Sequence, residues 1–187
     1  LQLKVGLIFG GASSEHHVSK ISKNYFKEAL KQEIYEVQEF EVDTQGRFHS
    51  SSNASLDSKI SQEVYQEILS CDICVPVIHG KGGEDGSIQG FLQTLEIPYV
   101  GPDFMSCALS LNKFWSKEVA RSLKIDVGKY RPLWQRDWIE DPKKSLAEIL
   151  SLLNFPLVVK PNRSGSTHGV KITENLEELK QGIKEAF

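Results

Sequence analysis

A glycine-rich segment that begins at His79 carries the strongest chemical signal in the sequence. Four of the chain's 14 glycines fall within residues 80–86. This segment follows an apolar run at 73–78 and precedes a helical apolar stripe formed by Ile88, Phe91, Leu92 and Leu95. Glycines at the carboxyl end of a strand expose backbone N–H groups where open α/β sheets bind ligands. We therefore predict a ligand-facing loop; the alternative is a structural turn in which Asp85 or Ser87 caps the next helix.

Glu15 stands after a glycine pair, at a second predicted junction between a strand and a helix. The pair Gly10-Gly11 follows the apolar run Leu3–Phe9. Glycines let a ligand approach the backbone, and a helix N-terminus favours negative charge. Taken alone, Glu15 is better explained as a residue that complements the helix dipole. The absence of G-x-G-x-x-G argues against a dinucleotide site. The adjacent His16 and His17 point in different directions on a helix, so we expect no joint metal site there.

A lysine precedes a third segment of interest, which is rich in hydroxyl side chains. Lys160 ends a predicted strand and is followed by the small, polar loop 161–169. Such a loop can fold over phosphates while the lysine contributes charge. The Walker A sequence is missing, and a plain hairpin with a solvated lysine explains the pattern equally well. Lys113 lies on a predicted helix and, considered without the other segments, is expected to be a solvated residue.

The elements that must position these residues predict an α/β fold. Leu3–Phe9, Tyr35–Val42, residues 73–78 and the short run 97–100 have the composition of strands. Helical spacing of apolar residues covers 18–30, 64–69 and 88–95. A strand, a glycine turn and a helix, in that order, open a doubly wound domain with a parallel sheet.

The pattern changes beyond Gly101-Pro102. One longer helix is predicted over 104–119, a strand over 129–134, and a helix that begins at Asp141-Pro142. Two strands, 156–160 and 170–172, flank the polar loop, and a last helix begins near residue 176. Because this helix runs to residue 187 without a polar tail, we expect a fragment or a partly resolved protein.

Composition excludes several classes of function. The net charge of −3 argues against nucleic acid as a partner, because phosphate backbones bind basic surfaces. No apolar run is long enough for a membrane span, and the N-terminal run is too short for a signal peptide, so a cytoplasmic location is expected. Cys71, Cys74 and Cys107 cannot all pair, which suits a reducing compartment. The spacing of Cys71 and Cys74 runs into a strand, so buried apolar thiols are expected instead of a metal or redox site.

Together and in order, four segments resemble the D-alanine:D-alanine ligase family of the ATP-grasp superfamily. The matching stretches are GGASSEHHVSKIS (10–22), HGKGGEDGSIQGFLQTLEIPYVGP (79–102), SLNKFWSK (110–117) and VVKPNRSGSTHGV (158–170). The resemblance implies a Rossmann-like substrate domain at 1–102 with a parallel sheet. The first, incomplete part of an ATP-grasp domain of α+β type would follow at 103–187.

The resemblance also implies roles on the amino-acid side of the site. Glu15 resembles a glutamate near the ammonium of the first D-alanine, and His79 is similar to a histidine that lines the same pocket. Val18 is assigned to that pocket too. Ser166 resembles the serine that connects to the glutamate and closes the site. Glu15 and Ser166 are thus the catalytic candidates.

On the nucleotide side, Lys113 and Lys160 resemble two lysines that bind ATP phosphates, and Gly165, Ser166 and Thr167 belong to a phosphate-covering loop. The family usually has Asp where Asn112 stands, and often Ser where Thr167 stands. Its Mg²⁺ ligands lie further C-terminal, so no metal ligand is expected within these 187 residues. We therefore expect the chain not to turn over by itself.

The activity that the resemblance implies is ATP-dependent formation of D-alanyl-D-alanine through an acyl phosphate, for peptidoglycan synthesis and hence cell-wall biogenesis and cell shape. The partners would be D-alanine and ATP, with no nucleic acid and no membrane; family members commonly form homodimers. Alternatives within the class are ligases that use D-lactate or D-serine as the second substrate. Outside it, a non-catalytic nucleotide-binding domain of a larger multifunctional chain stays open, whereas a nicotinamide-dependent oxidoreductase lacks its phosphate fingerprint.

Overall fold

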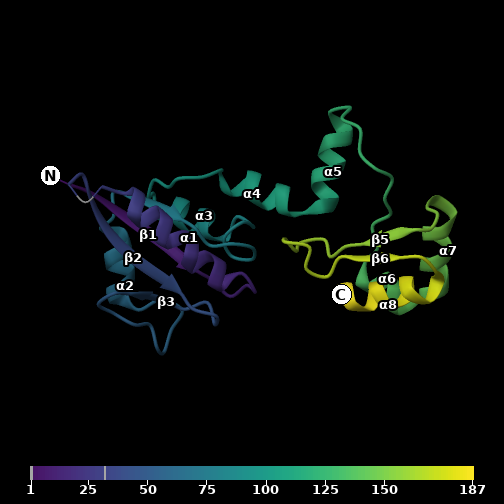
Figure 1. Cartoon of the computed structure of the whole chain (residues 1–187), viewed down its shortest axis with the longest axis horizontal. Coiled ribbons are helices and arrows are strands. Elements are labelled where there is room, and N and C mark those ends of the chain that lie inside the picture. The colour runs from purple at the N-terminus through teal and green to yellow at the C-terminus, as the bar shows by residue number, and fades with distance from the viewer. Residues whose placement is uncertain (1, 32) are drawn as a thin grey trace. The chain divides into compact units, whose positions relative to one another are not determined.

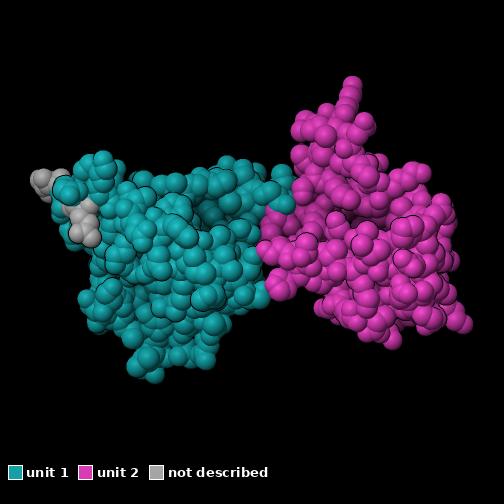
Figure 2. All heavy atoms as spheres, in the orientation of Figure 1, with its two compact units in different colours: residues 1–110 teal, residues 111–187 magenta. Residues whose placement is uncertain are grey.

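The computed structural model describes residues 2–31 and 33–187. By internal contacts the chain divides into two compact units, Leu1–Ser110 and Leu111–Phe187 (Figure 2). This division falls a few residues after the domain boundary expected at 102/103, which stays a prediction. No helix in the described ranges combines the length and the apolar character that crossing a membrane requires.

The first unit is built on a four-stranded sheet in the order β3-β2-β1-β4 (Figure 1). Its strands are β1 (Leu3–Gly10), β2 (Tyr35–Val42), β3 (Phe48–Ser50) and β4 (Ile73–Pro76). β1 pairs in parallel with both β2 and β4, whereas β3 runs antiparallel to β2. The parallel core of the sheet confirms the predicted α/β class.

Four helices accompany this sheet: α1 (His16–Ala29), α2 (Gln62–Leu69), α3 (Ser87–Thr94) and α4 (Phe104–Leu111). Side chains of β1 alternate between two apolar clusters, as the two-residue period of a strand requires. Ile8 packs in the cluster that includes Val64 and Ile68 of α2 and Leu92 of α3. On the other face, Phe9 lies under α1, where Lys23 Nζ is 5.0 Å from its ring centre. The sheet is therefore covered on both faces, which explains the near-continuous apolar sequence of β1.

The three cysteines are buried and free, as the sequence predicted. Cys71 and Cys74 lie against β1 at Gly6, where an added Cβ would stand 2.9 Å from Cys74 Sγ and 3.0 Å from Cys71 Sγ. Their place is in the apolar core, and the glycine makes room for both sulfur atoms.

Two predicted elements of the first unit differ from the structure. Residues 97–100 do not form a full strand, because only Tyr99 bridges to β4, at Cys74. The short antiparallel strand β3 was not predicted. It follows the turn at Asp43–Gly46 and pairs only from Phe48 to Ser50, which is too short for a clear alternating pattern.

The second unit joins helices to a two-stranded antiparallel sheet. Its elements are α5 (Lys113–Ser122), α6 (Gln135–Glu140), α7 (Pro142–Leu152), β5 (Leu157–Val159), β6 (Lys171–Thr173) and α8 (Leu176–Ala186). A core cluster joins Trp138, Leu146, Ile149, Leu157, Leu179 and Ile183. Asp141 caps α7 by accepting the N–H of Lys144 at 2.9 Å, as its sequence predicted.

Two predictions for this part of the chain are wrong. The single helix expected over 104–119 is two helices, because Asn112 takes an extended backbone conformation and caps α5. The strand expected over 129–134 is absent from the described residues, and a helix, α6, begins at Gln135. The sheet of this unit contains only β5 and β6, so that segment has no strand to pair with.

Candidate functional site

Glu15 and His79 follow adjacent parallel strands, and the structure brings their segments together at the carboxyl end of the sheet. The Ser13 hydroxyl donates to the backbone oxygen of His79 at 2.7 Å and accepts the N–H of Glu15 at 3.2 Å. The Glu15 carboxylate lies over Gly80, because a Cβ built on that glycine would stand 2.8 Å from Glu15 Oε2. Both predicted residues therefore belong to one cluster, in which Ser13 ties the two loops together.

Ser22 is a member of this cluster that the sequence analysis missed. Its hydroxyl lies 2.9 Å from His79 Nε2, while His79 Nδ1 is 3.9 Å from the nearer oxygen of Glu84. Glu15, Val18 and Ser22 are spaced by three and four residues, so they follow one face of α1. The expected pocket residue Val18 is half exposed on that face. The spacing from Glu15 was the signal that could have identified Ser22.

The glycine-rich loop is held by its own polar side chains. Asp85 accepts the N–H groups of Gly82 and Ser87, each at 3.0 Å, and these hydrogen bonds lower its pKa although its burial alone would raise it. Gln89 donates to the backbone oxygen of Gly83 at 2.7 Å, and its own side-chain oxygen is buried without a partner among the described residues. Asp85 thus closes the turn, and the loop holds a defined shape beside Glu15.

In the second unit, the structure brings Lys113 of α5 next to the segment that follows Lys160, although 47 positions separate the two lysines: the N–H of Lys113 donates to the backbone oxygen of Asn162 at 3.1 Å. Burial lowers the pKa of Lys113, and the ammonium group of Lys160 lowers it further. Lys113 Nζ also donates to the backbone oxygen of Ser164, within the polar loop. Two cationic groups that share one loop are an arrangement suited to a polyanion such as a triphosphate.

Lys117 is a third lysine near the same place, and it was not predicted. It lies one turn after Lys113 on α5, and its pKa is lowered by burial and then by Lys160. The Lys117 ammonium stands 4.5 Å from the centre of the Tyr130 ring. The i, i+4 spacing of two lysines on one helix was the available sequence signal.

The loop that carries Gly165, Ser166 and Thr167 has an unusual backbone. Ser166 and Thr167 both take positive φ, 45° and 60°, a region that residues other than glycine rarely adopt. They are the central residues of a turn in which the N–H of His168 donates to the backbone oxygen of Gly165 at 3.0 Å. Strain of this kind is stored where surrounding contacts or a ligand impose it. Lys113, Lys160 and this loop form one group, while a meeting of Ser166 with Glu15 stays a prediction.

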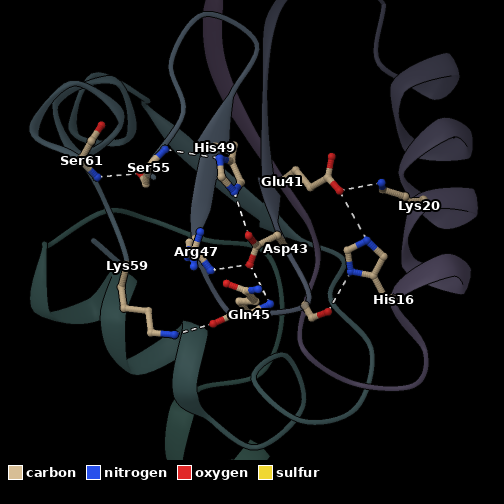
Figure 3. A network of polar contacts seen from close by, with 11 residues as sticks. His16, Lys20, Glu41, Asp43, Gln45, Arg47, His49, Ser55, Lys59 and Ser61 are labelled. Atoms are coloured by element: carbon tan, nitrogen blue, oxygen red, sulfur yellow. Dashed lines mark hydrogen bonds and ion pairs between the residues drawn. The ribbon is translucent and has the colours of Figure 1, made fainter. Parts of the chain in front are cut away.

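A further polar network lies at the β2–β3 turn (Figure 3). Asp43 accepts hydrogen bonds from two backbone N–H groups and from His49 Nε2 at 3.1 Å. These bonds lower its pKa, although burial acts in the opposite direction. The order Asp43, His49, Ser55 looks like a nucleophile relay, but Ser55 reaches His49 through its backbone N–H, at 3.3 Å, and its side chain is fully buried. The network is therefore a structural clasp.

The two histidines beside Glu15 have different surroundings. His16 Nδ1 lies 2.8 Å from the backbone oxygen of Gly11, and Nε2 faces Glu41 at 3.4 Å (Figure 3). His17 is exposed. Within residues 2–31 and 33–187, no group of three His, Cys, Asp or Glu side chains is arranged to bind a metal ion.

Comparison with known proteins gives one consistent family. The family "D-ala D-ala ligase N-terminus" matches residues 4–102, and "D-ala D-ala ligase C-terminus" matches 119–187. The "Bifunctional enzyme MurC/Ddl" of Chlamydia trachomatis serovar D is 36% identical over 191 residues, which cover 100% of this chain and 24% of that protein.

Solved structures agree with this result. The VanG D-Ala:D-Ser ligase from Enterococcus faecalis matches with a TM-score of 0.84 and 28% identity, covering 100% of this chain and 60% of the other. D-alanine--D-alanine ligase from Bacillus anthracis complexed with ATP gives 0.76 and 30%, with coverage of 100% and 53%. The chain thus spans between a quarter and three fifths of these relatives. On the strength of both family matches, it belongs to the D-alanine–D-alanine ligase family.

Proposed function

We propose that this chain supplies the D-alanine pocket and the ATP-phosphate contacts of a ligase that makes D-alanyl-D-alanine for peptidoglycan synthesis. The observation that carries the proposal is that Lys113 is hydrogen-bonded to the loop that follows Lys160, in which Ser166 and Thr167 take positive φ. The relative from Bacillus anthracis was solved with ATP, which supports nucleotide use. The cluster of Glu15 and His79 is the matching amino-acid site.

A carboxylate is a poor acyl donor because oxide is a poor leaving group, and transfer of the γ-phosphate to D-alanine removes this obstacle. The carboxylate oxygen attacks the γ-phosphorus and ADP leaves. The amine of a second D-alanine then attacks the acyl carbon, and inorganic phosphate departs as the peptide bond forms. Lys113 and Lys160 contribute by holding the phosphates and offsetting their charge.

Glu15 contributes by orientation. A carboxylate that binds the ammonium of the first D-alanine determines which way the substrate carboxylate points. Gly165, Ser166 and Thr167 would cover the phosphates and exclude water, which otherwise hydrolyses an acyl phosphate. Mg²⁺ is implied by the family, but the described residues include no side-chain group that could hold it, so no step is assigned to the metal.

Nucleotide titrations of the 187-residue chain test the ATP half. Lys113→Met and Lys160→Met should each weaken ATP binding by about tenfold or more, because each removes a charge-assisted contact, and leave adenosine binding unchanged. Lys143→Met is the matched control, since Lys143 is exposed on α7 of the same unit. If ATP binding is absent, or equal in all three variants, the phosphate site is wrong.

The amino-acid half needs a separate titration. D-alanine, but not L-alanine, should shift the amide NMR signals of Gly80 and His79. Glu15→Gln should abolish the shifts, whereas Glu28→Gln, an exposed change on the same helix, should retain them. Shifts that survive Glu15→Gln would contradict the assigned role of Glu15.

A second candidate is a D-alanine:D-serine ligase, favoured by the similarity to VanG. Product analysis with D-alanine and D-serine in competition, on the protein that contains this chain, separates the two. A third follows from the match to the bifunctional enzyme, of which this chain covers 24%. In that case the chain would be one nucleotide-binding part of a larger protein. The sequence on either side of these 187 residues would show whether a second enzyme is joined to it.

A further inference from the structure

The first turn of α5, which carries Lys113, is closed by two asparagines. A helix begins with four N–H groups that have no partner within the helix. Those of Phe114 and Trp115 donate to the side-chain oxygens of Asn162, at 2.9 Å, and Asn112, at 3.1 Å. The N–H of Lys113 donates to the backbone oxygen of Asn162 at 3.1 Å. Asn162 therefore satisfies two of these groups from a loop some fifty residues away.

The two side chains also bind each other. Asn162 Nδ2 donates to Asn112 Oδ1 at 3.0 Å, so this oxygen accepts two hydrogen bonds. We call this pair the asparagine clamp. Asn112 is 5% exposed, whereas Asn162 is exposed to solvent. An ordinary cap needs only the residue that precedes the helix. The second asparagine adds a link between α5 and the loop after β5.

The clamp lies next to both lysines in sequence. Lys113 directly follows Asn112, and Lys160 precedes Asn162 by two positions. The hydrogen bonds of the clamp thus fix the two backbone segments from which the lysine side chains project. Like charges repel more strongly as solvent is removed from between them, so these segments would separate if nothing held them. The bond from Lys113 Nζ to Ser164 adds a second tie, but only at the end of a flexible side chain.

We propose that Asn162 is a positioning residue for Lys113, which it holds against the loop after Lys160 so that both ammonium groups can contact one polyphosphate. This inference rests on the phosphate site proposed above. It explains why a loop asparagine is used where a cap within the helix would be sufficient. Asn112 suits this role, because an amide oxygen accepts both hydrogen bonds without placing a negative charge beside Lys113.

The test compares Asn162→Ala with Asn175→Ala. Asn175 caps α8 in the same unit by accepting the N–H of Glu178 at 3.0 Å, with no lysine site attached to it. Asn162→Ala should weaken ATP binding on the order of tenfold, as expected when one charge-assisted contact is lost, and leave adenosine binding unchanged. Asn175→Ala should lower thermal stability but not ATP affinity. Equal losses of ATP affinity in both variants would show that Asn162 acts as an ordinary helix cap and does not position Lys113.

Epistasis supplies a readout that a purely structural role would not move. If Asn162 acts through Lys113, then Asn162→Ala should have no further effect on ATP affinity in a Lys113→Met background. In a Lys160→Met background it should still have an effect. Additive losses in the Lys113→Met background would overturn the proposal. If Lys113→Met and Lys160→Met weaken binding but Asn162→Ala does not, the phosphate site stands and the clamp has no positioning role.

A last measurement needs no nucleotide. NMR titration of the Lys113 side chain should show its pKa rising toward the ordinary lysine value in Asn162→Ala, because the ammonium moves away from Lys160 and toward water. The amide of Phe114 should exchange faster with solvent in the same variant. An unchanged Lys113 titration would refute the positioning role, whether or not the chain binds ATP. Asn112→Asp should keep the Phe114 amide protected, because the new carboxylate still accepts from Asn162 Nδ2 and so keeps Asn162 Oδ1 in place as the acceptor of the Phe114 N–H.

Discussion

Gly80 gives the sharpest test of the role proposed for Glu15, because alanine there has two separable consequences. Gly80 has φ of +69°, so any side chain is strained. In addition, the new Cβ would stand 2.8 Å from Glu15 Oε2 and 3.4 Å from Ser13 Cβ. The contact with Ser13 is ordinary, so the carboxylate is the group that must move.

Gly82 provides the matched control in the same loop. It has φ of +91°, and a Cβ built on it meets nothing within 4 Å. Both alanine variants therefore lose the left-handed preference of glycine, about 1–2 kcal/mol each. Displacing the end of a flexible glutamate adds little to this loss of stability. We expect the two variants to unfold at similar temperatures, lowered by roughly 2–4 °C per kcal/mol for a chain of 187 residues.

Their affinities for D-alanine should differ. In Gly80→Ala the carboxylate of Glu15 is pushed from its place, and a displaced ion pair with the substrate ammonium costs about 1.5–3 kcal/mol, or roughly 10- to 100-fold in affinity. Gly82→Ala should bind D-alanine like the unchanged chain. Thermal unfolding and D-alanine titration of both variants measure the two effects separately. Equal D-alanine affinities at equal stability would show that the position of Glu15 does not determine binding.

Three further predictions concern residues of both units. Lys113→Met should stabilise the chain at pH 7 by less than about 1 kcal/mol, because the folded state lowers the pKa of Lys113 and disfavours its charged form. This gain in stability should shrink as the pH rises from the lowered pKa of Lys113 in the folded chain toward the ordinary pKa of lysine in the unfolded chain. Melting curves measured over a series of pH values would contradict the prediction if the gain in stability grew with pH. Thr167→Gly should raise stability by about 1 kcal/mol through relief of positive φ and weaken ATP binding, measured by unfolding and titration; a loss of stability would mean that φ at Thr167 is not strained. Ser22→Ala should remove the hydrogen bond to His79, lower D-alanine affinity several-fold and shift the ring signals of His79 in NMR spectra; unchanged ring signals would argue against that bond in solution.

The sequence predicted β1 and β4 because buried parallel strands have an apolar run that needs no partner to be recognised. The strand β2 has a mixed sequence, YEVQEFEV, and was predicted from its strand-forming tyrosine, valine and phenylalanine residues. It failed where structure depends on a distant segment. The strand expected at 129–134 has suitable residues but no strand beside it, since β5 pairs only with β6. The break at Asn112 was missed because the apolar periodicity continues through it, whereas the helix is interrupted by a cap that Asn162 stabilises.

The candidate site, like the fold, could be predicted from the sequence only in part. Glu15 and His79 could be placed together because each follows a strand of one parallel sheet, and such strands end at the same edge. Asn162 could not, since its partner Asn112 lies 50 positions away. For Ser22 the spacing from Glu15 indicates the face of α1, but not the hydrogen bond to His79, which lies 57 positions away. Their contributions depend on hydrogen-bond geometry, which has no periodicity in the sequence.

Features of two kinds near the candidate phosphate site cost folding free energy, and a bound anion would offset both. Lys113 and Lys160 repel each other, and Ser166 and Thr167 take backbone angles that disfavour their side chains. None of these features strengthens the core of the second unit, which lies among α6, α7, α8 and β5. A chain selected for stability alone would separate the lysines and place glycine in the loop. Because it does neither, the balance favours binding, and a polyphosphate between the lysines would turn their repulsion into two attractions. Stabilisation by ATP should therefore exceed that by ADP, and it should decrease with ionic strength.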